Sequence, residues 1–270
     1  MARIELPLWV MVIAGWLLLL RLPDRRGLVR LLTVAAVAWA AEQTLLRAHG
    51  YHFYSSEWLV VAGAVPLVLP MWWALAIVTA YDVTEHASDP RYAAAFAGLL
   101  VLADAAILQP WLVSVGGCRW NGAGPFGVAP IGIVAPAIIA YASGGVLRRA
   151  DRGPWQSVVV DGFAAVGTVH LAVLGAWHVG LKFLEGPWPA VATALVAVAI
   201  AALSAAIVWT RPGRARRRFG VVRTFGVGPM FGGLAARGAA SAQWAWTAAL
   251  FVPSLVARTR PSDVDNGSSK

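Results

Sequence analysis

The chain has 270 residues, of which 59% are hydrophobic and only 13% are charged. An ordinary soluble domain carries about 25% charged residues, so this composition excludes a soluble globular domain and a disordered chain. The formal net charge of +9 raises the question of nucleic-acid binding, which the positions of the basic residues must answer. The single cysteine, Cys118, excludes an internal disulfide and a CxxC metal or redox pair.

Taken in chain order, seven apolar segments qualify as membrane-crossing helices, each of which needs about 20 mostly apolar residues. No long polar region separates them, so we predict an all-α, polytopic transmembrane helix bundle that forms one domain over residues 1–260. The main basic cluster follows the first segment instead of preceding it, so we interpret this segment as a retained helix and not as a signal peptide. The segments are 6–20, 30–47, 58–81, 92–114, 127–147, 155–181 and 188–209.

The C-terminal region is less regular. Residues 239–256 are apolar, but Pro253 interrupts them, and crossing the membrane would carry Arg258 and Arg260 outside. We therefore favour an interfacial or re-entrant eighth helix there. Residues 261–270 have the composition of a disordered polar tail.

The basic residues predict the orientation of the bundle, because cytoplasmic loops of membrane proteins are enriched in Lys and Arg. With seven crossings, the first and fifth connections and the C-terminal tail share one face and hold 13 basic residues, against 3 on the other face. The N-terminus of a multi-pass cell-membrane protein is then outside and the C-terminus cytoplasmic, and the basic face contacts anionic lipid and not nucleic acid. The 13 are Arg21, Arg25, Arg26, Arg30, Arg148, Arg149, Arg152, Arg211, Arg214, Arg216, Arg217, Arg218 and Arg223.

Ionisable residues within the spans are functional candidates, because burying them in a membrane is costly. Asp104 lies near the middle of the fourth segment and has no charged neighbour in sequence, and Glu42 lies about one turn below the outer surface in the second. Glu57 is expected to open the third helix, where a dipole-complementing carboxylate would explain it equally well.

Asp82, Glu85 and His86 have the spacing of one helical face. They form either half of a metal site or an ordinary polar helix end. The chain has no phosphate-binding loop, zinc-protease motif or aspartate-rich diphosphate motif, and we predict no metal and no cofactor.

Aromatic, Gly and Pro residues collect at the outer face, in Gly50–Glu57, Val65–Trp73 and Gln109–Pro130. Pro66 and Pro70 are expected to kink the third helix, and the Gly/Pro/Trp-rich connection is expected to fold over the mouth of the bundle. Some of these aromatics suit an interfacial belt. Others lie deeper than a belt requires, namely Trp39, Trp72 and Trp73.

Over residues 50–140 the chain resembles the carotenoid hydratase family, the polytopic membrane proteins that include bisanhydrobacterioruberin hydratase. The resemblance rests on Tyr51–Tyr54, on Val65-Pro66-Leu67 before Trp72-Trp73, on Asp104 before Gln109-Pro110, and on the Trp120-Asn121 turn that runs into Gly124–Pro130. It implies an enzyme that adds water to an isoprenoid alkene. Gln109 stands where family members have a second aspartate, and Ile131–Val134 replaces an Asn and Gly-Trp element.

Hydration of an alkene requires a proton donor shielded from water, and a carboxylic acid in an apolar site meets this need. Aromatic faces then stabilise the carbocation, and bound water quenches it. We expect Asp104 to be the acid, with Glu42 as second choice and Glu57 as a further candidate. The expected cation-stabilising walls and substrate-binding groups are Trp39, Trp72, Trp73, Trp111, Trp120, His52, Tyr54 and Asn121.

Three alternatives remain open. If the site holds no bound water, a neighbouring double bond attacks the cation, and the enzyme is a transmembrane terpene cyclase. This outcome is favoured because Gln109 replaces the second carboxylate. From another class, intramembrane acids also suit a proton-coupled transporter, although the chain shows no inverted repeat. The third alternative is a non-catalytic scaffold of lipid biosynthesis.

Overall fold

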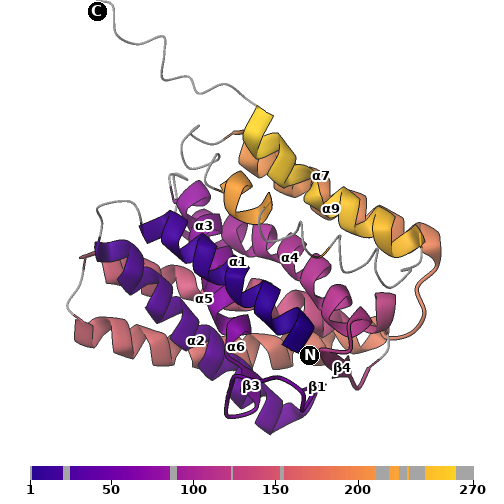
Figure 1. The fold of residues 1–270 in the computed structure, drawn as a ribbon, viewed down its shortest axis with the longest axis horizontal. Coiled ribbons are helices and arrows are strands. Elements are labelled where there is room, and N and C mark those ends of the chain that lie inside the picture. Colours follow the sequence, from indigo (N-terminus) through magenta and orange to yellow (C-terminus); the bar gives the residue numbers. More distant parts are fainter. Residues whose placement is uncertain are drawn as a thin grey trace, which may run out of the picture.

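The fold was analysed in a computed structural model, which describes residues 2–20, 25–85, 90–122, 124–152, 155–210, 219–224, 230 and 241–259. The chain is an all-α bundle with two small β elements (Figure 1). This confirms the all-α part of the predicted fold class. The helices are α1 (Ala2–Leu20), α2 (Arg25–His49), α3 (Val68–Thr84), α4 (Pro90–Ser114), α5 (Pro130–Arg152), α6 (Trp155–Val179), α7 (Ala190–Trp209) and α9 (Ser241–Thr259), and residues 219–224 are also helical.

Five of the helices are long and apolar enough to cross a membrane, while α1 and α3 contain shorter apolar stretches. The chain therefore has the character of a membrane protein, but only five of the seven expected spans meet this length. The five are Gly27–His49, Tyr92–Ser114, Pro130–Ala150, Gln156–Val179 and Ala190–Trp209.

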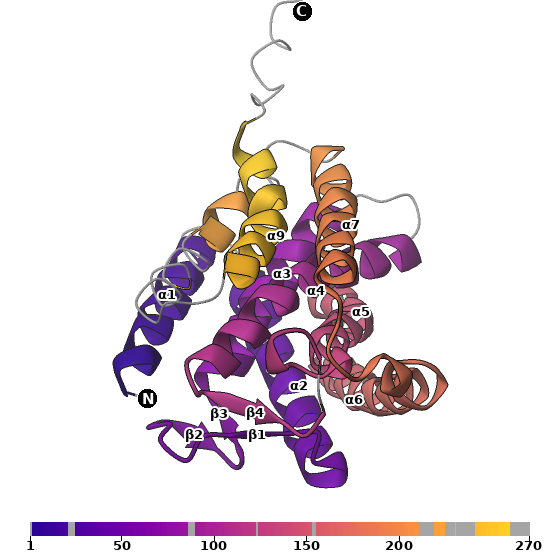
Figure 2. The same cartoon turned by 90° about the vertical axis from the view of Figure 1, so that its right-hand side faces the viewer.

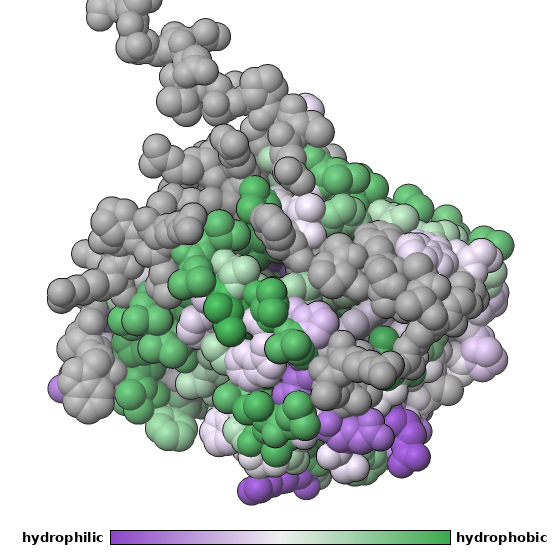
Figure 3. Space-filling view, viewed as in Figure 1, coloured by the Kyte–Doolittle hydropathy of each residue, from purple (hydrophilic) through white to green (hydrophobic). Residues whose placement is uncertain are grey.

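The core lies around α3 and α4, and nearly every residue of α3 is buried. The α6 and α7 helices, by contrast, leave much apolar surface exposed, including Phe163 and Leu171. Figure 3 shows apolar residues over the helices and polar residues gathered at the lower edge, near β1 and β4. An apolar exterior of this kind suits contact with lipid.

The third predicted helix begins ten residues late, because its apolar start forms a hairpin of β2 (Val61–Ala62) and β3 (Val65–Pro66). Gly63 makes the turn at a φ of +69°, a conformation that favours glycine. The expected proline kink is wrong: Pro66 ends β3, and Pro70 lies in the first turn of α3, where its missing N–H costs nothing.

A second ribbon joins two connections at the same end of the bundle. β1 (His52–Tyr54) pairs antiparallel with β4 (Cys118–Trp120), and the 3-10 turn η1 (Pro125–Gly127) follows. Another 3-10 turn, η2 (Leu181–Leu184), follows α6. The aromatic connections therefore fold over this end of the bundle, as expected from their composition.

The C-terminal apolar segment forms one continuous helix, α9, which includes Pro253. It lies beside α7 in both views (Figures 1 and 2). Gln243 and Trp246 attach it to α4 by donating hydrogen bonds to the carbonyl oxygens of Pro110 and Ala106, over 3.3 and 2.6 Å. The segment therefore packs as part of the bundle, and the expected polar tail at 261–270 lies outside the described residues.

Candidate functional site

The β1–β4 ribbon directs four side chains toward α2. Successive residues of a strand point to opposite faces, so His52 and Tyr54 share one face, and their cross-strand partners Trp120 and Cys118 share it with them. Phe53, on the opposite face, is exposed. The Tyr-His-Phe-Tyr stretch is therefore a short strand that places a histidine and a tyrosine over the helices.

Glu42 of α2 is the acid that these side chains meet. It is 7% exposed, and the Tyr54 hydroxyl donates a hydrogen bond to its Oε1. The Nε2 atom of His52 lies 3.5 Å from the same oxygen, and its ring stacks on Trp120 with ring centres 4.3 Å apart. Glu42 Oε2 and His52 Nε2 are buried and have no hydrogen-bond partner among the described residues, so both remain available to a bound molecule.

A small cavity of about 30 Å³ lies against these groups and is walled by apolar side chains and two tryptophans. This volume has room for about one or two water molecules. Gly132 permits the Trp120 ring to lie there, because a Cβ atom on Gly132 would come within 2.4 Å of Trp120 Cζ2. The lining residues are Glu42, Leu45, His52, Trp73, Gln109, Trp120, Gly132, Ala135, Pro136 and Ile139.

Two ribbon side chains are held in their neutral forms by this environment. Burial raises the pKa of Tyr54 well above its usual value, and any negative charge on the neighbouring Glu42 raises it further, so Tyr54 remains a hydrogen-bond donor. Burial and Glu42 likewise raise the pKa of Cys118 to about 12. A thiol with this pKa is not a nucleophile at neutral pH, so the cysteine serves packing.

Asp104 has a partner that its sequence neighbourhood does not reveal. Arg223 donates from Nε to Asp104 Oδ1 over 3.0 Å and from Nη2 to Oδ2 over 2.7 Å. Its other contacts are to Thr79 Oγ1 at 2.6 Å and to the carbonyl oxygen of Ala76 at 3.0 Å. Its guanidinium carbon also lies 3.6 Å from the centre of the Phe219 ring.

This geometry corrects the assignment of Arg223 to the basic, lipid-contacting face, because Arg223 is 3% exposed and lies in the core. A fork of two N–H donors facing both carboxylate oxygens is the geometry of a charged carboxylate–guanidinium pair. Asp104 is therefore not an isolated acid. Gln109 lies five residues further along α4, about 7.5 Å along the axis, and it is Gln109 that faces the Glu42 cavity.

The other predicted site residues lie apart from the Glu42 cavity. Glu57 is exposed in a turn before β2 and does not begin a helix, because the helix starts only at Val68. Trp39 is 37% exposed and donates its indole N–H to the Ala62 carbonyl oxygen over 2.9 Å. The side-chain N–H of Asn121 donates a hydrogen bond to the Gly50 carbonyl oxygen and so connects the residues that flank β4 and β1. Trp72 and Trp111 are buried elsewhere, each with an indole N–H that lacks a partner.

Glu5 is a buried acid that the sequence reasoning missed. It is 1% exposed, and its carboxylate accepts hydrogen bonds from the backbone N–H groups of Leu59 and Val60 over 2.6 and 3.0 Å. It therefore holds the start of the hairpin segment. Its position at the beginning of an apolar stretch, four residues before Trp9, is a weak signal that ordinary first-turn acids share.

No cluster of metal-binding side chains is present among the described residues. Within the predicted half-site, Asp82 and Glu85 both pair with Arg30, over 2.7 and 3.2 Å. The third member, His86, lies outside the described residues. The two acids thus have a structural role that ties α3 to α2.

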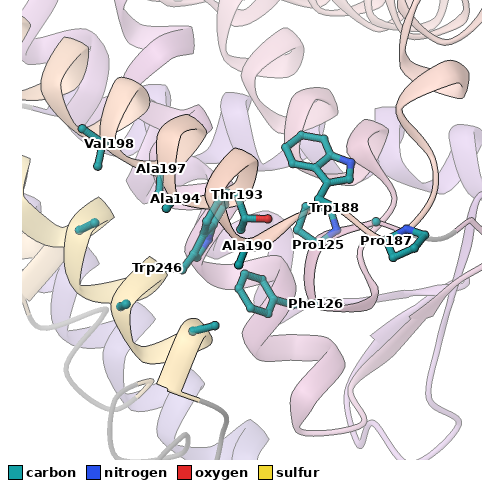
Figure 4. Close-up of a pocket in the computed structure, with 14 residues that line it drawn as sticks. Pro125, Phe126, Pro187, Trp188, Ala190, Thr193, Ala194, Ala197, Val198 and Trp246 are labelled. Carbon is teal, nitrogen blue, oxygen red and sulfur yellow. The ribbon is translucent and has the colours of Figure 1, made fainter.

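A larger apolar pocket of about 570 Å³ lies between α7, α9 and η1 (Figure 4). Alanines on both helices leave the space open, and Phe126 and Trp246 meet edge to face at its base, with ring centres 5.6 Å apart. Among the described lining residues, Thr193 has the only side-chain hydroxyl. The volume suits a drug-sized or lipid-sized hydrophobic group, but these described residues include no acid or base.

Comparisons with protein-family models, with curated proteins and with solved structures found no match to this chain. The resemblance to carotenoid hydratases therefore rests on the motifs alone.

Proposed function

We propose that this chain is a membrane-embedded enzyme of isoprenoid metabolism in which Glu42 protonates an alkene. The observation that carries the proposal is a buried acid with one free oxygen, facing a small cavity walled by Trp73, Trp120 and His52. A carboxylic acid shielded from water, beside aromatic faces, is the combination that acid-initiated carbocation chemistry needs.

Glu42 is favoured over Asp104 as the acid because the two carboxyl groups have different partners. Both oxygens of Asp104 are occupied by the Arg223 guanidinium, so proton transfer from Asp104 would first require breaking that pair. Glu42 makes one hydrogen bond to a neutral tyrosine, and among the described residues no Arg or Lys lies within ion-pair distance of it.

The proposed reaction begins when Glu42 gives its proton to one alkene carbon. The π electrons form the new C–H bond, leaving a tertiary cation on the other carbon and a carboxylate on Glu42. The faces of Trp73 and Trp120 stabilise the cation. Water held near Gln109 then forms the C–O bond and gives a proton back to Glu42, directly or through His52, so that the net change is addition of one water.

If a second double bond of the substrate attacks the cation instead, a ring forms and loss of a proton to Glu42 restores the acid. The same constellation thus serves a hydratase or a cyclase. The end group of an isoprenoid is larger than a cavity of about 30 Å³, so the reaction requires the lining side chains to move apart on binding.

The test is expression of the full chain in a host that makes linear carotenoids and other prenylated lipids, followed by mass analysis of the products. A gain of one water identifies a hydratase, and an unchanged mass with a new retention time identifies a cyclase. Glu42→Gln should lower product formation at least 100-fold, the usual contribution of a general acid. Glu57→Gln is the matched control and should leave product formation unchanged, whereas full activity of Glu42→Gln contradicts the mechanism.

A proton-coupled transporter is the second candidate, and the buried Asp104–Arg223 pair within the bundle favours it, because transporters use such groups. Proton-dependent uptake of a solute into vesicles containing the purified chain would support this candidate. Product formation by the chain alone would argue against both a transporter and a non-catalytic scaffold.

A further inference from the structure

A groove of about 300 Å³ lies between α5 and α6, beside the C-terminal half of α5, whereas the Glu42 cavity lies beside its N-terminal half. Its α5 wall has Tyr141, Gly145 and Arg148, spaced four and three residues apart, and its α6 wall has a similar stripe from Asp161 to Thr168. Residues with these spacings share one face of a helix. The groove is therefore formed by two facing stripes, and small residues on both keep it open.

The guanidinium group of Arg148 lines this groove. Its Nη1 atom is buried and has no hydrogen-bond partner in the part of the chain that the structure describes, although a buried donor without a partner is costly. The neighbouring Arg149 is already engaged, because its Nε donates to Asp161 Oδ2 over 3.0 Å. Since that pair neutralises itself, Arg148 is the remaining charge among the described residues that line the groove.

The groove lies near the end of the predicted membrane spans, where a lipid phosphate can reach it. The α5 span ends at Ala150 and the α6 span begins at Gln156, so Arg148 lies about 3 Å inside the end of its span. The flank of α6 beside the groove exposes Val160 and Phe163, which are 65% and 77% accessible. Acyl chains would cover this flank, which a free phosphate could not do.

We infer that the α5–α6 groove binds the phosphate of an anionic phospholipid through Arg148. Arginine presents its N–H donors in a fork that matches phosphate oxygens, and basic pockets between membrane helices are known to hold anionic headgroups. The proposal concerns a defined site and is independent of the reaction at Glu42.

The test is native mass spectrometry of the full chain in detergent, titrated with phosphatidylglycerol and, separately, with phosphatidylcholine. The wild-type chain should retain phosphatidylglycerol preferentially. Arg148→Gln should weaken this binding about tenfold, as expected for loss of a charge-assisted contact. Gly145→Leu should weaken it to a similar extent without changing charge, because open space surrounds the Gly145 position and the leucine would fill the groove.

The matched control is Lys182→Gln, which removes one positive charge from η2, beyond the far end of α6 from the groove, and should keep binding within about twofold. Equal losses in this control and in Arg148→Gln would overturn the proposal, and so would wild-type binding by Gly145→Leu. Thermal unfolding of each variant checks that it is folded. Displacement of the lipid by millimolar inorganic phosphate would identify a small-anion site and overturn the assignment to lipid.

Discussion

Removal of the Arg223 guanidinium should destabilise the bundle strongly, because it would leave the Asp104 carboxylate buried without a cation. The structure shows four hydrogen bonds from Arg223, two to Asp104, one to Thr79 and one to the Ala76 carbonyl oxygen. Breaking one partner of a buried pair costs about 3–5 kcal/mol. We expect Arg223→Met, which keeps the apolar stem, to lower the free energy of unfolding by about this amount.

The double variant Asp104→Leu with Arg223→Met should recover much of the loss, because replacing a buried pair with apolar residues is often neutral. The coupling between the two sites should then be about 2–3 kcal/mol. Unfolding can be followed by fluorescence of the 14 tryptophans while a denaturing detergent is titrated into mixed micelles.

Arg149→Met is the matched control. Its ion pair with Asp161 has side chains that are 60% and 30% exposed, and exposed pairs contribute about 0–1 kcal/mol. If Arg223→Met costs no more than Arg149→Met, or if the losses at Asp104 and Arg223 simply add, the buried pair does not stabilise the bundle and the reasoning fails.

Three further outcomes are expected. Gly132→Leu should abolish product formation while the chain still folds, because the Cβ atom of the new leucine would lie 2.4 Å from Trp120 Cζ2 and would force the Trp120 ring out of the cavity. Product assays and thermal unfolding check this. Full activity would contradict the assigned cavity. Cys118 should react with maleimide about 1000-fold more slowly than a thiol of pKa 9.0, because its pKa is about 12. The rate of the maleimide reaction should rise about tenfold per pH unit. A denaturing detergent should restore the reactivity of an ordinary thiol. Glu5→Leu should cost about 1–2 kcal/mol, since two part-buried backbone N–H groups lose a charged acceptor. Amide exchange at Leu59 and Val60 should accelerate, whereas unchanged exchange would show that Glu5 does not hold the hairpin.

The helices could be predicted from the sequence because a long apolar run between polar ends has few other structures available to it in a membrane. The prediction for the third apolar segment was wrong at its start, because apolar residues alone do not distinguish a helix from a hairpin. Gly63 and Pro66 are the local signals of a turn and a strand end within this apolar segment.

The Glu42 cavity could be predicted in part. Glu42, His52, Tyr54 and Trp120 were all singled out by residue type and by their place near the outer face, and the structure brings them together. The pairing that does so joins residues 52–54 to residues 118–120. No local pattern records a contact across such a distance in sequence.

Arg223 shows the same limit more sharply, because its acid partner lies 119 residues earlier in the chain. Counted with the basic tail, it is one more positive charge at the membrane surface. Placed by the structure, it is a core residue that links residues 219–224 to both α3 and α4. Net charge by region predicts an orientation, but it cannot identify an arginine that folds back into the bundle.

The two buried acids therefore have separate parts in the molecule, and this separation can be measured. Asp104 is bound on both oxygens by a cation, so its loss should affect stability first and product formation only through stability. Glu42 has a free oxygen beside a cavity, so its amide variant should lose product formation while unfolding at nearly the wild-type temperature. If Asp104→Asn instead abolishes product formation at unchanged stability, the assignment of the acid must be reversed, because only a group that takes part in the chemistry changes activity without changing the fold.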